Sequence, residues 1–329
     1  MNKDNIHWYA NDNTNCELIG LENIHNSCYM DSILMALFAN PNEYILNKLL
    51  YTEPNYNNDK CSKSKRKNKK YLQQIQLLLN VYFKKIHGYG NLSPKLNNVT
   101  LLRKYIGKCK HGKKFNTGRM EESGEFLLFL FDIFDVNGGY TRTQTIYDIN
   151  NNVTGDIIIN KNASIYTLDS FTLRNFKRMY KNKPVKMDKL LTTITYNEFS
   201  DPIIHKNKPY LFTYQIHEYI DSPYFVIWLL RQDPITEKKN KLLVEPGQSL
   251  YIRDTKIRRQ LISIIIHIGN TIHSGHYVTM FNCNNNWYLY DDIRSNIKYI
   301  GSYNNMINHK LNPRKNGVLF FYTKIINNK

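Results

Sequence analysis

The chain changes texture at the NGG turn of residues 137–139. Before this turn, apolar residues recur at helical spacing; after it, short β-rich runs alternate with turns containing Asn, Lys and Pro. The runs are TQTIYDI, TGDIIIN, PYLFTYQI, YFVIWLL, QLISIIIHI, HYVTMF, NWYLYDD and GVLFFYTKI. No internal repeat is present. The pattern predicts an α+β fold, with a helical first half followed by a mostly antiparallel sheet.

Three helices are expected in the first half, after a polar lead-in at residues 1–19. In the first helix, the apolar positions are Met30, Ile33, Leu34, Leu37 and Phe38, and Pro41 ends the helical pattern. The second helix is expected at 71–86 and follows the basic run KSKRKNKK, which is expected to be a linker. The third is expected at 121–134, where acidic residues occupy the first turn, as the helix dipole favours.

Composition limits the class of protein. At 329 residues, with 42% hydrophobic and 13% aromatic residues, the chain can bury a sizeable core. No apolar run approaches the roughly 20 residues that span a bilayer, and the polar, acid-containing N-terminus is unlike a signal peptide. We therefore expect an intracellular protein, cytoplasmic or nuclear, with no membrane partner.

The five cysteines lie far apart and form no CxxC pair. This spacing favours a reducing compartment and argues against both a disulfide framework and a zinc ribbon. We therefore expect no bound metal and no cofactor.

The net charge of +18 raises the question of a nucleic-acid partner. However, Lys, Asn, Ile and Tyr are used heavily along the whole chain, as codon bias in an AT-rich genome would produce. We therefore expect no specific nucleic acid. For KSKRKNKK at 63–70, a solvated loop is favoured over a nuclear-targeting or polyanion-binding patch. Such a genome suits an AT-rich protist or a large DNA virus, and a viral protein would lie in the host cytoplasm or the virion.

One cysteine stands directly before a helix-patterned run, in IHNSCYMDSILMALF at 24–38. A thiol in the first turn of a helix feels the positive end of the dipole, which favours the thiolate. Buried cysteines are also common as small hydrophobes. Cys28 is therefore either an activated nucleophile or an inert core residue, and only a partner elsewhere in the chain can decide between these.

A candidate partner lies at 264–292, where HYVTMF and WYLYDD flank an Asn-rich turn and predict a β-hairpin. With the turn centred near 283–284, His276 lies opposite Asp291 or Asp292, and a carboxylate would fix the imidazole tautomer. A lone strand histidine is usually structural, as we expect for His267, while His273 is expected in a loop. Paired aspartates usually mark a turn, so each feature is weak by itself.

Together these segments resemble a known family. GLENIHNSCYMDSILMALF resembles the cysteine box of the ubiquitin-specific protease family of deubiquitinases, and SGHYVTMF with WYLYDD resembles its histidine box. MEESGEFLLFLFDIF is similar to its acidic helix. The other similar segments are FVIWLLRQDP and KLLVEPGQSLYI in the palm, QLISIIIHIGN before the histidine loop, and the closing strand GVLFFYTK. The matches follow family order from Gly20 to about Lys324.

The resemblance implies a papain-like cysteine peptidase with a helical thumb, an antiparallel β palm and a fingers region. One catalytic domain is expected at 20–329, with the thumb at 20–139 and the fingers and palm at 140–329. The family's paired CxxC motifs are absent, so the fingers are expected to be shortened and zinc-free. His25 stands where the family usually has glycine, and NSCYMDS is most similar to the cylindromatosis-type branch.

The resemblance also implies roles for individual residues. Cys28 would be the nucleophile, His276 the base, and Asp291 the third catalytic residue, with Asp292 as the alternative. Asn23 and the Cys28 backbone N–H would stabilise the oxyanion.

Further roles concern the substrate tail. Glu122 and Glu125 would bind its arginines, or else would only compensate the helix dipole. Gly275 and Tyr277 would form the narrow passage for the two terminal glycines, since glycine leaves room for a substrate backbone.

The implied activity is thiol-dependent hydrolysis of the peptide or isopeptide bond after the C-terminal glycine of ubiquitin. The implied partners are ubiquitin and ubiquitinated proteins. A protease for a ubiquitin-like modifier and a catalytically weak ubiquitin-binding scaffold are the alternatives. The sequence leaves chain linkage, protein substrates and oligomeric state open.

Overall fold

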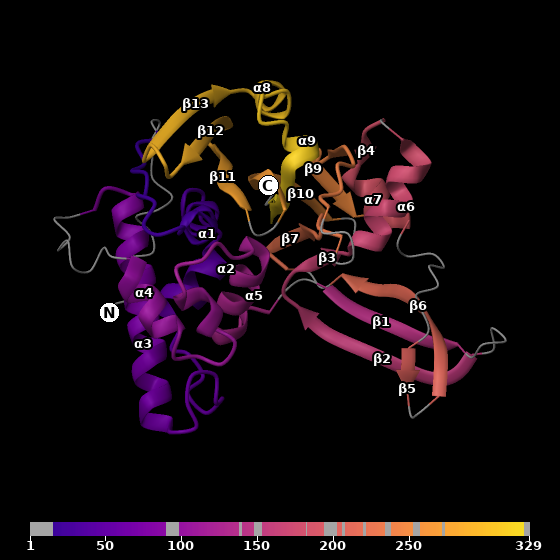
Figure 1. Cartoon of the computed structure of the whole chain (residues 1–329), viewed down its shortest axis with the longest axis horizontal. Helices are drawn as coiled ribbons and strands as arrows, with labels where there is room; N and C mark the ends of the chain where they lie inside the picture. The colour runs from indigo at the N-terminus through magenta and orange to yellow at the C-terminus, as the bar shows by residue number, and fades with distance from the viewer. Residues whose placement is uncertain are drawn as a thin grey trace. The chain divides into compact units, whose positions relative to one another are not determined.

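The computed structural model describes residues 16–89, 99–137, 140–147, 153–181, 183–193, 203–205, 208–219, 222–233, 238–252, 257–271 and 274–325. The chain forms two compact units (Figure 1). Unit 1 comprises Met1–Val136, Gln232–Lys239 and Ile262–Leu319, and unit 2 comprises Asn137–Arg231, Asn240–Leu261 and Phe320–Lys329. Most of the expected lead-in, residues 1–15, lies outside the described residues, as does His273.

Unit 1 contains most of the helices that the structure describes. They are α1 (Cys28–Phe38), α2 (Glu43–Leu46), the π-helix η2 (Asn47–Tyr51), α3 (Lys65–Ile86), α4 (Val99–Ile106), the 3-10 helix η4 (Lys113–Asn116), α5 (Ser123–Ile133), α8 (Tyr303–Ile307) and α9 (Pro313–Asn316). Helix α1 lies against α2, α3 and α5. Every residue of α1 is buried, because the helix contacts α3 and α5 as well as the sheet of the unit. A helix that is apolar all round is stable only in such a core position. The three expected helices are confirmed.

Helix α3 begins earlier than expected. Residues 65–70 form its first turns, so the prediction of a basic linker at 63–70 is wrong for most of that run. Long straight-chain residues such as Lys and Arg are good helix formers, and the apolar face that begins at Leu72 packs into the core.

The sheet of unit 1 contains β11 (Ser274–Cys283), β12 (Asn286–Asp291), β13 (Asn296–Gly301) and the C-terminal part of β10 (Ile257–Thr271), in the order β13-β12-β11-β10. All of these pairs are antiparallel. The β11–β12 hairpin is confirmed. Its turn lies at Asn284 and Asn285, one residue later than expected, because both asparagines adopt a left-handed backbone with φ of 51° and 64°.

Unit 2 contains a separate four-stranded antiparallel sheet in the order β2-β1-β6-β5. Its elements are β1 (Tyr140–Tyr147), β2 (Val153–Ala163), β3 (Tyr166–Leu168), α6 (Ser170–Tyr180), β4 (Val185–Lys186), α7 (Met187–Thr193), β5 (Ile203–His205), β6 (Lys208–Tyr219), β7 (Tyr224–Leu229), β8 (Val244–Glu245) and β9 (Ser249–Ile252). β10 and β14 (Gly317–Lys324) contribute residues to both units. The β3–β7 and β4–β8 pairs are parallel, so the expected antiparallel character holds for most pairs. That the expected fingers region binds no metal stays a prediction.

The cysteines contradict the expectation of unpaired thiols. Cys16 is disulfide-bonded to Cys283, with 6.2 Å between their Cα atoms, and Cys61 is bonded to Cys109. Only Cys28 is a free thiol, and it is buried. The prediction failed because separations of 267 and 48 residues along the chain do not determine distances in the folded unit.

Among the described residues, no helix is both long and apolar enough to cross a membrane.

Candidate active site

Cys28 is the first residue of α1, at the end of a strained loop. His25 and Asn26 have φ of 52° and 59°, a left-handed backbone that non-glycine residues adopt at a cost. Arg103 of α4 holds this loop, because its Nη1 donates to the carbonyl oxygens of His25 at 2.7 Å and Ile24 at 3.3 Å. The absence of glycine at His25 is thus accommodated by a strained backbone that a buried arginine fixes.

The Cys28 thiol is protonated in this conformation. Burial raises its pKa to about 11, while the backbone N–H of Tyr277 acts against this effect. The carboxyl groups of Asp292 and Asp31 raise the pKa further. At Cys28, desolvation therefore acts against the effect that the helix dipole has on the thiol.

His276 lies on β11, directly before Tyr277. Its Nε2 is 2.8 Å from Oδ1 of Asp291 and 3.4 Å from Oδ1 of Asp292. Nδ1 is then the ring nitrogen left for the thiol. In this structure no hydrogen bond joins Cys28 Sγ to the imidazole, although both residues are described. The thiol contacts the backbone N–H of the residue that follows the histidine.

A group of buried polar residues surrounds this pair. The Ser27 hydroxyl donates to Oδ2 of Asp31, and the Ile24 N–H donates to Ser27 Oγ at 2.8 Å. Burial raises the pKa of Asp31 well above its usual value, and the neighbouring Asp292 raises it further. The raised pKa favours the neutral acid form of Asp31, and in that form its carboxyl group can donate a hydrogen bond to Asp292.

Asp292 lies between this acid and the histidine. Burial raises the pKa of Asp292, whereas His276, the Asn23 side chain and Asp31 act in the opposite direction. The Asn23 N–H also donates to the Asp292 carbonyl oxygen at 3.2 Å. Asn23 is thus positioned through Asp292, five residues before the thiol.

The two acidic residues of α5 have different surroundings. Glu122 is the N-cap residue of α5 and is partly buried, whereas Glu125 lies in the first turn. Glu125 Oε2 is 2.5 Å from Nζ of Lys114, and both side chains are 41% exposed. Lys114 therefore already occupies one of the carboxylates expected to bind a basic tail.

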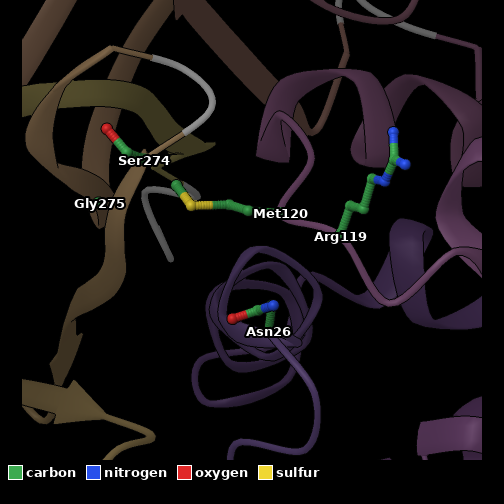
Figure 2. Close-up of a pocket in the computed structure, with 5 residues that line it drawn as sticks. All are labelled: Asn26, Arg119, Met120, Ser274 and Gly275. Atoms are coloured by element: carbon green, nitrogen blue, oxygen red, sulfur yellow. The ribbon is translucent and has the colours of Figure 1, made fainter.

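A pocket of about 500 Å³ lies beside these residues, lined by Asn26, Arg119, Met120, Ser274 and Gly275 (Figure 2). Asn26 precedes the thiol, Met120 precedes α5, and Gly275 precedes the histidine. Figure 2 shows Met120 pointing across the pocket towards Ser274 and Gly275, and Arg119 pointing away from them. The pocket thus lies between three segments, which carry the thiol of Cys28, the imidazole of His276 and the two glutamates of α5.

Only glycine fits at position 275, because of both its backbone conformation and the atoms around it. Its φ is 138°, and a Cβ there would lie 2.3 Å from the Ile268 carbonyl oxygen and 2.8 Å from Nε2 of His267. Tyr277 is buried, with its ring 4.7 Å from the ring of His267, and it does not line the pocket. His267 is buried too, as expected for a structural residue; burial lowers its pKa to about 4.

Among the described residues, His276, Asp291 and Asp292 offer ligand atoms within 4.8 Å of one another, close enough for a metal ion. Contacts between an imidazole and the carboxylates that orient it account for the same closeness without a metal.

Ser27, Asp31 and Arg103 were missed by the sequence analysis. Asp31 had a detectable signal, because it is an acidic residue in the otherwise apolar helix CYMDSILMALF. Arg103 had none, since its role depends on α4 packing against the loop before Cys28.

A sequence profile described as Ubiquitin carboxyl-terminal hydrolase matches residues 19–322. The chain belongs to the ubiquitin carboxyl-terminal hydrolase family. It is a cysteine-type ubiquitin hydrolase, and the resemblance to ubiquitin-specific proteases is confirmed. The similarity to the cylindromatosis-type branch stays a prediction. A comparison with curated protein sequences gave no match.

Solved structures of this fold include a SAGA DUB module with Ubp8, Sgf11, Sus1 and Sgf73 bound to monoubiquitin. It shares 18% identity over 94% of this hydrolase and 69% of that chain, with a TM-score of 0.63. The same four proteins bound to ubiquitin aldehyde give 18% identity, coverage of 94% and 70%, and a TM-score of 0.60. A yeast SAGA DUB module with a substituted Sgf73 shares 17% identity over 94% of this hydrolase and 69% of that chain, with a TM-score of 0.60. These likenesses confirm the expected α+β fold of the hydrolase.

Proposed function

We propose that Cys28, His276 and Asp291 hydrolyse the peptide or isopeptide bond after the C-terminal glycine of ubiquitin. The observation that supports this most directly is the 2.8 Å contact between His276 Nε2 and Asp291 Oδ1. His276 lies on β11, and the backbone N–H of the next residue, Tyr277, contacts the thiol of Cys28. These contacts support the roles of nucleophile, base and base-orienting residue for three side chains of one unit.

The reaction begins with proton transfer from the thiol to Nδ1 of His276, once the imidazole is within hydrogen-bond reach of the thiol. Because burial holds the pKa of Cys28 at about 11, the thiolate forms only together with the imidazolium. The thiolate attacks the carbonyl carbon of the terminal glycine, and the imidazolium then protonates the leaving amine. Water hydrolyses the resulting thioester and regenerates the thiol.

The negative charge on the carbonyl oxygen requires preorganised donors. The Cys28 N–H, at the start of α1, has no acceptor within the helix. The Asn23 amide is held near Asp292 and supplies a second donor. We assign Asp291 as the residue that orients His276, since it is closer to Nε2 than Asp292 is, and Asp292 as the residue that positions Asn23.

The substrate tail would lie in the pocket beside Gly275. Ubiquitin is the proposed partner because structures of this fold were solved bound to monoubiquitin and to ubiquitin aldehyde. The carboxylates of Glu122 and Glu125 suit the arginines that the family's substrate tail carries. A ubiquitin-like modifier with a similar tail is the alternative. We further propose that 20–329 acts as one catalytic domain, in the cytoplasm or the nucleus.

A covalent probe tests the proposal. We expect ubiquitin with a C-terminal thiol-reactive group to form one adduct per chain, at Cys28, because this is the only free thiol in the structure. The Cys28→Ala variant should form no adduct but should still bind ubiquitin, since other groups hold the tail. Intact mass and peptide mapping measure both. Labelling of another cysteine would refute the assignment, and an adduct with a ubiquitin-like probe alone would favour the alternative substrate.

A further inference from the structure

Two basic segments of unit 1 contain no acidic residue. They are 60–70 (KCSKSKRKNKK) and 104–114 (KYIGKCKHGKK). The first contains the N-terminal turns of α3, and the second runs from α4 to η4. All their cationic side chains are exposed except that of Lys60, which is partly buried. We call these two segments together the basic surface.

The fold joins the two segments at two points, and a third contact lies next to them. The Lys110 N–H donates to the Lys60 carbonyl oxygen at 2.7 Å, and the next residues form the Cys61–Cys109 disulfide. Farther along, the rings of Tyr71 and Tyr105 lie 6.5 Å apart, where α3 and α4 run side by side (Figure 1). Charges that are far apart in sequence are thereby held on one surface.

Most cations of this surface lack an acidic partner. Lys60, Lys69 and Lys114 form ion pairs with Asp132, Glu53 and Glu125. Among the described residues, no ion pair involves the remaining cations, which are Lys63, Lys65, Arg66, Lys67, Lys70, Lys104, Lys108, Lys110 and Lys113. Repulsion between them is therefore largely uncompensated by the residues that the structure describes.

The position of these cations also opposes helix stability. Lys65, Arg66 and Lys67 occupy the first turn of α3, where the helix dipole favours negative charge, and that turn has no acidic residue. Ser64, the N-cap residue, makes no side-chain capping bond. Codon bias explains many lysines, but not their concentration in two segments that meet in space and exclude carboxylates.

We propose that the basic surface binds the phosphate backbone of nucleic acid without reading its sequence. Phosphate contacts need a dense set of exposed cations and give sequence-independent affinity. Tyr71 directly follows the first segment and Tyr105 lies within the second, and their partly buried rings are 6.5 Å apart. An anionic membrane is a poorer fit, because no exposed large hydrophobic side chain lies in either segment to enter the lipid.

The test is fluorescence anisotropy with labelled DNA duplexes of two unrelated sequences, using the oxidised full chain at several salt concentrations. We expect equal affinity for both duplexes, and a logarithm of the binding constant that falls linearly with the logarithm of salt concentration. The triple variant Lys65→Gln, Arg66→Gln, Lys67→Gln should bind at least tenfold more weakly, with a slope smaller by about 2 to 3, because each phosphate contact contributes about 0.9. The triple variant Lys104→Gln, Lys108→Gln, Lys110→Gln should behave in the same way.

A matched variant removes the same charge elsewhere in unit 1. Arg294→Gln, Lys298→Gln and Lys310→Gln change three exposed cations outside the basic surface, and should alter affinity less than twofold. All three variants should react with the ubiquitin probe at the rate of the unmodified chain, so DNA binding and the proposed hydrolysis are tested separately. Equal loss of binding in the matched variant would refute the basic surface as a site. Binding to phosphatidylserine vesicles but not to DNA would refute nucleic acid as the partner.

Discussion

At the scale of single residues, the most informative feature is Asp31, a carboxylic acid enclosed in α1. Its raised pKa is caused first by burial and then by Asp292, while the Ser27 hydroxyl acts against it. An unfolded aspartate titrates near pH 4. Between that value and the higher folded pKa, the folded state binds more protons than the unfolded state. The free energy of unfolding therefore falls as pH rises through this window.

Replacing Asp31 by asparagine should remove this fall in the free energy of unfolding, because asparagine does not ionise. In Asp31→Asn, the amide oxygen can accept from Ser27 and the amide nitrogen can donate to Asp292, as the neutral acid does. We expect the free energy of unfolding of Asp31→Asn to rise relative to that of the unmodified chain between pH 4 and 7, by roughly 1 kcal/mol or more at pH 7. Urea unfolding at pH 4, 5.5 and 7 measures it.

The exposed Asp59→Asn is the matched control, and should show no such trend. If the difference between Asp31→Asn and the unmodified chain does not change with pH, Asp31 is already ionised in the fold. Loss of probe labelling in a folded Asp31→Asn protein would instead show that the carboxyl group is needed at the site.

At the scale of elements, the ion pair between η4 and α5 affects substrate binding. Lys114 and Glu125 are half-exposed, and such pairs contribute about 1 kcal/mol or less. We expect Lys114→Ala to free Glu125 for the basic tail and to tighten ubiquitin binding, by about two- to fivefold. Titration with labelled ubiquitin at low salt, using the Cys28→Ala background, measures the change.

Lys113→Ala removes a neighbouring cation that makes no ion pair, and it should change affinity less. Weaker binding in Lys114→Ala would mean that the lysine itself contacts the substrate. Unchanged affinity would favour the simpler interpretation that Glu125 only compensates the dipole of α5.

Elements were predictable from the sequence where periodicity was strong. α1, α5 and the strands of the C-terminal half follow from apolar spacing and β-branched runs. α6 was not predicted, although SFTLRNFKRMY has one apolar face and follows an N-cap residue, Asp169, whose side chain accepts from the Thr172 N–H at 2.7 Å. The hairpin turn was placed one residue early, because several asparagines in NCNNN tolerate the left-handed backbone.

At the scale of the whole molecule, the order of motifs predicted the family, but the sequence could not reveal how segments meet in space. The thiol, imidazole and carboxylates were found because their local sequences match family motifs. Arg103, which holds the loop before Cys28, belongs to no such motif, and neither do the paired cysteines. Contacts of this kind depend on tertiary packing, which spacing along the chain does not encode.

The disulfides provide a test of the whole molecule. Cross-links that close loops of 48 and 267 residues stabilise a fold by roughly 4 and 5.6 kcal/mol in the chain-entropy model. We therefore expect dithiothreitol to lower the Tm by at least about 5 °C. A chain purified without reductant and then denatured should titrate one thiol, Cys28, whereas the fully reduced chain should titrate five.

Paired and single substitutions separate the two cross-links. Cys16→Ser alone should raise the thiol count from one to two, because Cys283 loses its partner, and Cys16→Ser with Cys283→Ser should return it to one. Cys61→Ser with Cys109→Ser should likewise titrate one thiol, and should retain the Cys16–Cys283 peptide in a non-reducing digest. Five thiols in the chain purified without reductant would contradict both disulfides and support the reducing compartment that the spacing of the cysteines suggests. Since Cys28 takes part in neither bond, the rate of probe labelling by the reduced chain should fall only where reduction unfolds unit 1.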